Sequence, residues 1–92
     1  MLDEETRTFY VGEAKIKLTS LESFVLGTLI MNKYRVIRTR ELAIMTFGHY
    51  NLDESSMDCI RQVLSLLRKK FQGIMQITND RTYGIRIRYI GE

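Results

Sequence analysis

The chain has 92 residues, of which 45% are hydrophobic and 27% are charged, and its net charge is +3. A chain of this length forms one domain around one modest core. Its single cysteine excludes an internal disulfide and a zinc site of clustered thiolates, and it favours a reducing, cytoplasmic environment. No apolar stretch approaches the roughly 20 residues of a membrane-spanning helix, so we expect no membrane association of this chain.

An acidic start and a short hairpin are the first predicted features. Asp3, Glu4 and Glu5 crowd the beginning, and residues 1–6 are expected to be a disordered tail or the remnant of a linker. Residues 7–92 are expected to form the single domain. Polar and apolar residues alternate over 7–11 and 14–18, and Gly12 is placed first in a two-residue turn between them. This pattern predicts an antiparallel hairpin.

Two helices are predicted next. Thr19 and Glu22 have the spacing of a capping box, in which each side chain accepts a hydrogen bond from a backbone amide of the first turn. The apolar residues that follow at helical spacing, toward an end near Asn32, are Leu21, Phe24, Val25 and Leu29. After an extended connector, Thr39 is expected to cap a second, shorter helix, which Gly48 ends.

The segment 53–71 predicts a third, strongly amphipathic helix, capped by Asp53 or Ser55. One narrow stripe belongs in a core and consists of Ile60, Leu64, Leu67 and Phe71. The outward set consists of Asp58, Arg61, Gln62, Ser65, Leu66 and Lys69. A second apolar edge beside the stripe consists of Leu66, Cys59 and Val63. Contact with the wing or the second helix is the preferred interpretation of this edge, and a protein partner is the alternative.

The chain ends in a predicted hairpin, with strands over 74–78 and 83–90 and a turn at 79–82. Ile85, Ile87 and Tyr89 share one face of the last strand, whereas Arg86 and Arg88 share the other. The order is therefore β-β-α-α-α-β-β, an α+β winged helix-turn-helix with a C-terminal wing. Basic charge is concentrated in the last third of the chain, which suits a polyanionic partner.

Several stretches resemble the OmpR/PhoB type of winged-helix effector domain, including its ToxR-like relatives: KLTSLES, VIRTREL, FGHYNLD, LLRKKF and ITNDRTYGIRI. The resemblance extends from Phe9 to Tyr89. It implies a DNA-binding transcription regulator without a cofactor, often attached to a receiver domain or a membrane segment. The chain departs from the pattern at Thr82, where a glycine is usual, at Ile85, where a tyrosine is usual, and at Leu66, where an arginine is usual.

Double-stranded DNA is the expected partner, with helix 55–71 in the major groove and wing 74–90 on adjacent backbone or the minor groove. Gln62 can bond an adenine edge in two places, and Arg61 or Lys69 can reach guanine or phosphate. The candidate DNA-binding residues are Arg61, Gln62, Ser65, Leu66, Arg68, Lys69, Arg81, Arg86, Arg38, Thr39 and Arg40. The last three could hold one phosphate at the start of the second helix. The alternative is a helix face that contacts only solvent.

A second functional hypothesis is a winged-helix module that binds RNA polymerase or another regulator. Its candidate contacts are His49, Tyr50, Asn51 and Leu66, because this loop joins helices where the resembled family often contacts polymerase. Two copies of the chain on repeated half-sites are also expected. The sequence offers no nucleophile with a matched base, no glycine-rich phosphate loop and no metal-ligand spacing around its one histidine. It therefore predicts no enzyme activity, no cofactor and no metal.

Overall fold

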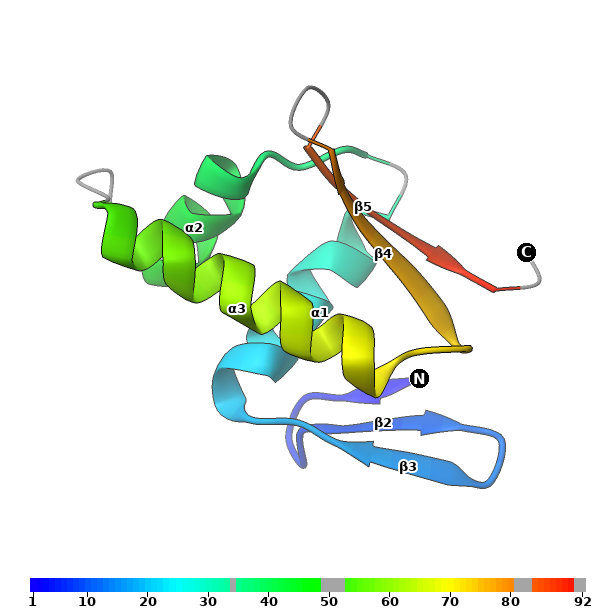
Figure 1. Cartoon of the computed structure of the whole chain (residues 1–92). Helices are drawn as coiled ribbons and strands as arrows, with labels where there is room; N and C mark the ends of the chain where they lie inside the picture. The colour runs from blue at the N-terminus through cyan, green and yellow to red at the C-terminus, as the bar shows by residue number, and fades with distance from the viewer. Residues whose placement is uncertain (34, 49–52, 81–83, 91–92) are drawn as a thin grey trace.

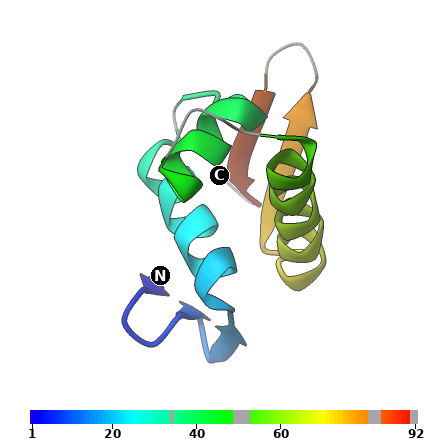
Figure 2. The same cartoon turned by 90° about the vertical axis from the view of Figure 1, so that its left-hand side faces the viewer.

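The computed structural model of this chain describes residues 1–33, 35–48, 53–80 and 84–90. The elements in these residues are β1 (Leu2–Asp3), β2 (Thr8–Val11), β3 (Ala14–Lys17), α1 (Ser20–Met31), α2 (Thr39–Phe47), α3 (Glu54–Lys70), β4 (Met75–Asp80) and β5 (Gly84–Tyr89). Three helices form the centre, the N-terminal sheet lies at one end, and the β4–β5 hairpin lies beside α3 (Figure 1). In Figure 2 the N-terminal sheet lies at the lower end of the molecule and the hairpin rises beside α3, while Tyr89 at the end of β5 lines one hollow with Met1, Leu2 and Tyr10.

The predicted order β-β-α-α-α-β-β is confirmed, and the structure adds the short strand β1 before it. The predicted disordered tail over residues 1–6 is corrected accordingly, because Leu2 pairs with Phe9 of β2 and packs against the core. The backbone amide of Tyr10 also donates to the carbonyl of Met1, at 2.8 Å. An open edge of β2 and an apolar side chain at position 2 together explain why the acidic start is ordered.

Helix α1 begins with the predicted capping box. The Thr19 hydroxyl accepts from the Glu22 amide at 3.2 Å, and the Glu22 carboxylate accepts from the Thr19 amide at 2.9 Å. The predicted apolar stripe is wrong at Phe24, which is 49% exposed, whereas Leu26 is fully buried. Apolar residues occur all round this helix, so its periodicity does not select the face that the core buries.

Helix α2 and its cap each begin one residue earlier than predicted. The N-cap is Arg38, which makes no side-chain capping bond, and Thr39 is the first helical residue. The prediction that Thr39 caps the helix is therefore corrected: Arg38 has the extended backbone of a cap, with φ −74° and ψ 151°. Gly48 ends the helix with a φ of 72°, as its position predicted, because glycine tolerates the left-handed conformation.

Helix α3 buries the stripe that its sequence predicts: Ile60, Leu64, Leu67 and Phe71 have no exposed surface. Asp53, rather than Ser55, is the cap, since its carboxylate accepts from the Ser56 amide at 2.9 Å. At the other end, the ring of Phe71 meets that of Phe9 edge to face, with centroids 5.0 Å apart. This contact joins the end of α3 to the N-terminal sheet.

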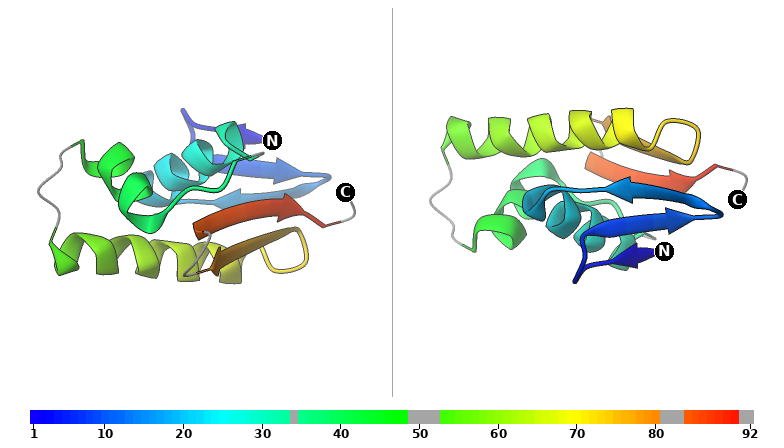
Figure 3. Two further views of the ribbon diagram at one scale, coloured as in Figure 1. Left: turned by 90° about the horizontal axis from the view of Figure 1, so that it is seen from above. Right: turned by 90° about the horizontal axis from the view of Figure 1, so that it is seen from below.

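The β4–β5 hairpin is fixed against the helical core from two sides. Ile85 exchanges two backbone hydrogen bonds with Ile37 in the α1–α2 connector, at 2.6 and 3.0 Å. On the other side, the Arg68 Nε of α3 donates to the Ile77 carbonyl of β4 at 2.9 Å. Views from above and below both show the hairpin alongside α3 (Figure 3). The helix and the wing therefore form one continuous surface.

Candidate nucleic-acid interface

The outward face of α3 is the centre of the candidate site. All six residues predicted to face outward are exposed: Asp58, Arg61, Gln62, Ser65, Leu66 and Lys69. The predicted apolar edge is smaller than its sequence suggests, because Val63 is only 6% exposed and Cys59 is partly buried. Leu66, which is 48% exposed, is the apolar member that solvent reaches most.

The N-terminal half of α3 carries nearly balanced charge. The Arg61 Nη1 lies 2.7 Å from the Asp58 carboxylate and 3.7 Å from that of Glu54. All three side chains are at least half exposed, so these ion pairs contribute at most about 1 kcal/mol each. The Arg61 guanidinium can therefore exchange a carboxylate for another acceptor at little cost.

The basic cluster at the end of α3 divides into two anchors and one outward cation. Arg68 is bonded to the wing, and the Lys70 Nζ donates to Glu22 at 2.6 Å and to the Lys17 carbonyl at 3.0 Å. Lys69 is exposed and has no ionic or hydrogen-bonding partner within the described residues, which agrees with its predicted direction. Of these three basic residues, Lys69 is therefore the one whose side chain has no partner among the described residues.

The carboxylate of Glu22 is the buried acceptor that holds the second anchor, Lys70. Its residue is only 2% exposed. Burial raises the pKa of this carboxyl, but the hydrogen bonds from Lys70 and Thr19 and the charge of Lys70 outweigh it, so the pKa lies below its ordinary value. The group is therefore ionised at neutral pH, and it holds α3 against the start of α1.

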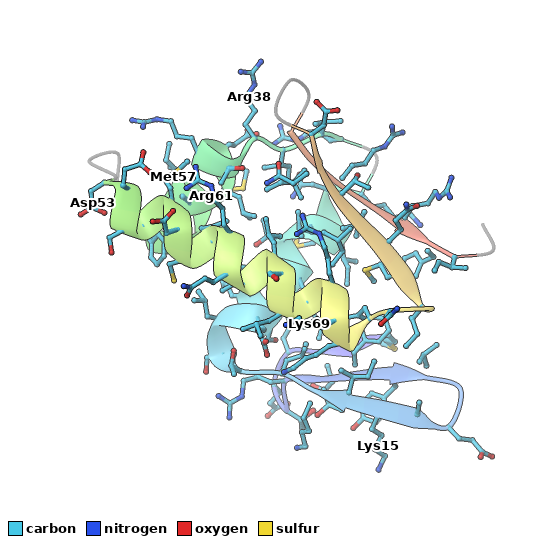
Figure 4. All side chains as sticks on the ribbon, viewed as in Figure 1. Lys15, Arg38, Asp53, Met57, Arg61 and Lys69 are labelled. Carbon is cyan, nitrogen blue, oxygen red and sulfur yellow. The ribbon has the colours of Figure 1, made fainter. Side chains whose placement is uncertain are left out.

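A polar groove of about 540 Å³ lies between the start of α2, α3 and the adjoining ends of β4 and β5. Its lining residues are Arg38, Thr39, Arg61, Asn79, Asp80 and Gly84. Three candidate DNA-binding residues from distant parts of the sequence are thus brought together. Figure 4 shows Arg38 projecting from the top of the molecule, with Arg61 below it on α3. Arg40, one residue into α2 from Thr39, is exposed.

The outer face of the wing carries the predicted arginines. Arg86 and Arg88 line a shallow hollow of about 260 Å³ with Gln76 and Thr78. The Arg88 Nη2 donates to the Gln76 side-chain carbonyl at 3.3 Å, while the Arg86 guanidinium is exposed. The predicted contacts Arg81, His49, Tyr50 and Asn51 lie outside the described residues.

Two lysines on β3 are exposed residues that were not among the predicted contacts. Lys15 and Lys17 alternate with the inward-facing Ile16, and the Lys17 carbonyl lies next to the end of α3. The alternation was visible in the sequence, but the proximity to α3 was not. Within the described ranges, no group of three or more His, Cys, Asp or Glu side chains could hold a metal ion, and no helix is long and apolar enough to cross a membrane.

The three-helix core with a fixed C-terminal hairpin defines a winged helix-turn-helix domain. No family model and no curated protein matches the chain. Among solved structures, it is similar to the DNA-binding domain of the response regulator AdeR, determined in complex with an intercistronic region. The sequences are 26% identical, the TM-score is 0.73, and the match covers 97% of this chain and 93% of that one. The predicted resemblance to the OmpR/PhoB type of winged-helix DNA-binding domain is thereby confirmed.

Proposed function

We propose that this chain is a cytoplasmic DNA-binding transcription regulator in which α3 enters the major groove and the wing contacts adjacent backbone or the minor groove. The observation that carries the proposal is the Arg68 to Ile77 hydrogen bond, which fixes the wing beside the exposed polar face of α3. The likeness to a response-regulator domain determined in complex with an intercistronic region supports DNA as the partner.

Base reading is assigned to the middle of α3. Gln62 is exposed there and has the paired donor and acceptor that an adenine edge requires, and Ser65 follows on the same face. Arg61 would exchange its carboxylate partners for guanine acceptors, and Leu66 would contact a thymine methyl. Because the charge of Arg61 is offset by neighbouring carboxylates, this half of α3 contributes more to base selection than to general affinity.

Phosphate contacts are assigned to the rim of the surface. Arg38, Thr39 and Arg40 present cations and the first amides of α2 beside the polar groove, a combination that suits one phosphate. Arg86 would contact backbone from the wing, and Arg81 a narrow minor groove or a phosphate. At the end of α3, Lys69 would contact a further phosphate, and Arg68 would do the same through its remaining guanidinium donors.

A fluorescence titration with random duplex DNA at two salt concentrations tests the proposal. Binding should weaken steeply as salt rises, because neutralised phosphates release condensed counterions. Replacing Lys69 by Gln should cost about 1 to 3 kcal/mol if it contacts a base edge, and Arg81→Ala tests the wing in the same way. Lys33→Gln, on the connector after α1, is the matched control. Absence of binding at low salt, or binding without salt dependence, would count against DNA as the partner.

A second candidate function is a protein-interaction module that contacts RNA polymerase or another regulator. The position of the half-exposed Leu66 on the outward face of α3 favours it, because a partner protein could bury this apolar side chain. The loop contacts His49, Tyr50 and Asn51 belong to the same proposal. A pulldown of RNA polymerase should weaken with Leu66→Asp and with Tyr50→Ala, and capture that survives both would remove this surface.

Binding of two copies to repeated half-sites remains part of the proposal. Sedimentation of the chain with duplexes that carry one or two copies of a selected site would measure the stoichiometry. Cooperative loading of the second copy is expected, and independent loading at the affinity of a single site would contradict it.

A further inference from the structure

We infer that Lys15 and Lys17 of β3, together with Lys69 of α3, form a second backbone-contacting edge for nucleic acid, on the side of α3 opposite the wing. We call these three residues the lysine edge. The inference rests on the proposed DNA-binding function and extends it to a strand that neither the sequence motifs nor the winged-helix layout assigns.

Strand β3 is an open edge of its sheet, since the strand order is β1-β2-β3. The Leu18 amide donates to the Arg7 carbonyl at 2.9 Å. In an antiparallel pair, the residues of β3 that are hydrogen-bonded to β2 therefore recur at every second position counted back from Leu18. By the same alternation, the backbone groups of Lys15 and Lys17 point away from β2. The amide and carbonyl of Tyr10, which lies opposite Lys15, are bonded to Met1 on the other side, as this alternation requires.

The end of α3 is attached directly to this open edge. The Lys70 Nζ donates to the Lys17 carbonyl, which points away from β2, at 3.0 Å. It also donates to the Glu22 carboxylate at 2.6 Å, which holds the ammonium in this position. Among the described residues the outward amides of Lys15 and Lys17 have no acceptor, and they remain as donors that an anion can use. The next residue back along the helix is Lys69, whose exposed ammonium is unpaired within the described part of the chain.

The charge of this region is positive on balance. Lys15 and Lys17 are exposed, and the Lys15 ammonium lies 6.0 Å from the centroid of the Tyr10 ring, which leaves it accessible. The carboxylate near the end of α3, Glu22, is buried and already paired with Lys70. Two carboxylates oppose this charge: Glu13, in the β2–β3 turn at the end of β3 away from Lys17, and Asp3, which lies two strands from Lys17 in the same row as Thr8. The three lysines of the lysine edge outnumber them. Figure 4 shows Lys69 on the last turn of α3 and Lys15 below it on β3.

The position of the lysine edge follows the geometry of a duplex. A major groove about 12 Å wide accommodates one helix, so phosphate backbones pass on both sides of an inserted helix. Here the wing lies on one side of α3 and the β2–β3 hairpin lies on the other (Figure 1). If the wing meets one backbone, the lysine edge meets the other. An acidic extended peptide added to β3 would be the protein alternative, but the Lys70 Nζ already donates to the Lys17 carbonyl with which such a strand would pair.

The test measures the salt dependence of binding to random duplex DNA for the full chain and for Lys15→Gln, Lys17→Gln and the double variant. Each lysine that neutralises a phosphate should make the slope of log K against log salt shallower by about 0.9. Lys33→Gln removes the same charge from a lysine that lies 5.1 Å from the centroid of the Tyr89 ring and should leave the slope unchanged. Circular dichroism and melting temperature should not move in the two β3 variants or in their combination, because the replaced side chains are exposed.

The two levels of the proposal fail in different ways. A wild-type chain without salt-dependent DNA binding would overturn the proposed function and the lysine edge with it. A wild-type chain that binds with a steep slope, while the double variant keeps that slope, would overturn the lysine edge alone. A shallower slope in both β3 variants and in Lys33→Gln would show a general charge effect and would also overturn it.

Discussion

The pair formed by Glu22 and Lys70 gives an asymmetric mutational prediction. The Glu22 side chain is 3% exposed and that of Lys70 is 35% exposed, although their charged atoms are 2.6 Å apart. Glu22→Gln leaves a lysine that can turn to water, so it should cost about 1.5 kcal/mol, the lower range for a hydrogen bond to a charged group. Lys70→Met leaves a buried carboxylate without its cation, which should cost about 3 kcal/mol.

Urea denaturation followed by circular dichroism measures both free energies of unfolding. In a domain of this size, each 1 kcal/mol corresponds to a melting shift of roughly 4 to 8 °C, so the two variants are separable by melting as well. The double variant should cost less than the sum of the single ones, because the two side chains contact each other. If Lys70→Met proves no more costly than Glu22→Gln, burial of the carboxylate is not what makes the pair important.

The same pair predicts how stability depends on pH. The pKa of Glu22 is lowered in the folded chain, so its contribution is complete above the ordinary carboxyl pKa and declines as the pH falls through the folded value. In Lys70→Met, burial is no longer offset by the cation, and the pKa of the carboxyl should rise instead. The stability deficit of this variant should therefore be largest near neutral pH and should shrink on acidification. A deficit that is constant from pH 7 to pH 3 would contradict the assignment.

Two further predictions concern the attachment of the wing. Gly84 has a φ of 107°, and an added Cβ would lie 2.7 Å from the Ile37 carbonyl oxygen, so Gly84→Ala should cost about 2 to 3 kcal/mol in urea denaturation. Gly73→Ala, at a φ of 84° with open space around it, should cost only about 1 kcal/mol, and equal costs would exclude the steric contact. Arg68→Met should lower stability by about 1.5 kcal/mol and speed amide exchange in β4, whereas Arg86→Met should do neither.

The stability of the helix-to-wing attachment bears directly on the proposed function. The surface that would meet DNA consists of elements that are distant in the sequence and are held by a few backbone contacts. Arg68 and Ile37 fix the hairpin, and Lys70 fixes the end of α3 to the N-terminal sheet. Because the contacts of Ile37 and Lys70 position the surface without belonging to its outward face, weakening them should reduce DNA affinity through loss of preorganisation.

Local patterns in the sequence determined much of this fold. The amphipathic stripe of α3, the capping box at Thr19, the stop at Gly48 and the alternation of Ile85 to Arg88 all involve residues within a few positions of one another. Periodicity and capping act over that range, so they could be read without the tertiary structure. The outward direction of Lys69 followed from the same helical geometry.

Tertiary structure decided which partners these elements have. The bonds of Lys70 to Lys17 and Glu22 join residues 53 and 48 positions apart, and no local pattern encodes them. The burial of Leu26 in place of Phe24 depended on which neighbours covered α1, because that helix is apolar on most sides. Local geometry thus fixed the elements and their faces, whereas packing between distant segments fixed which cations are anchors and which remain available to a ligand.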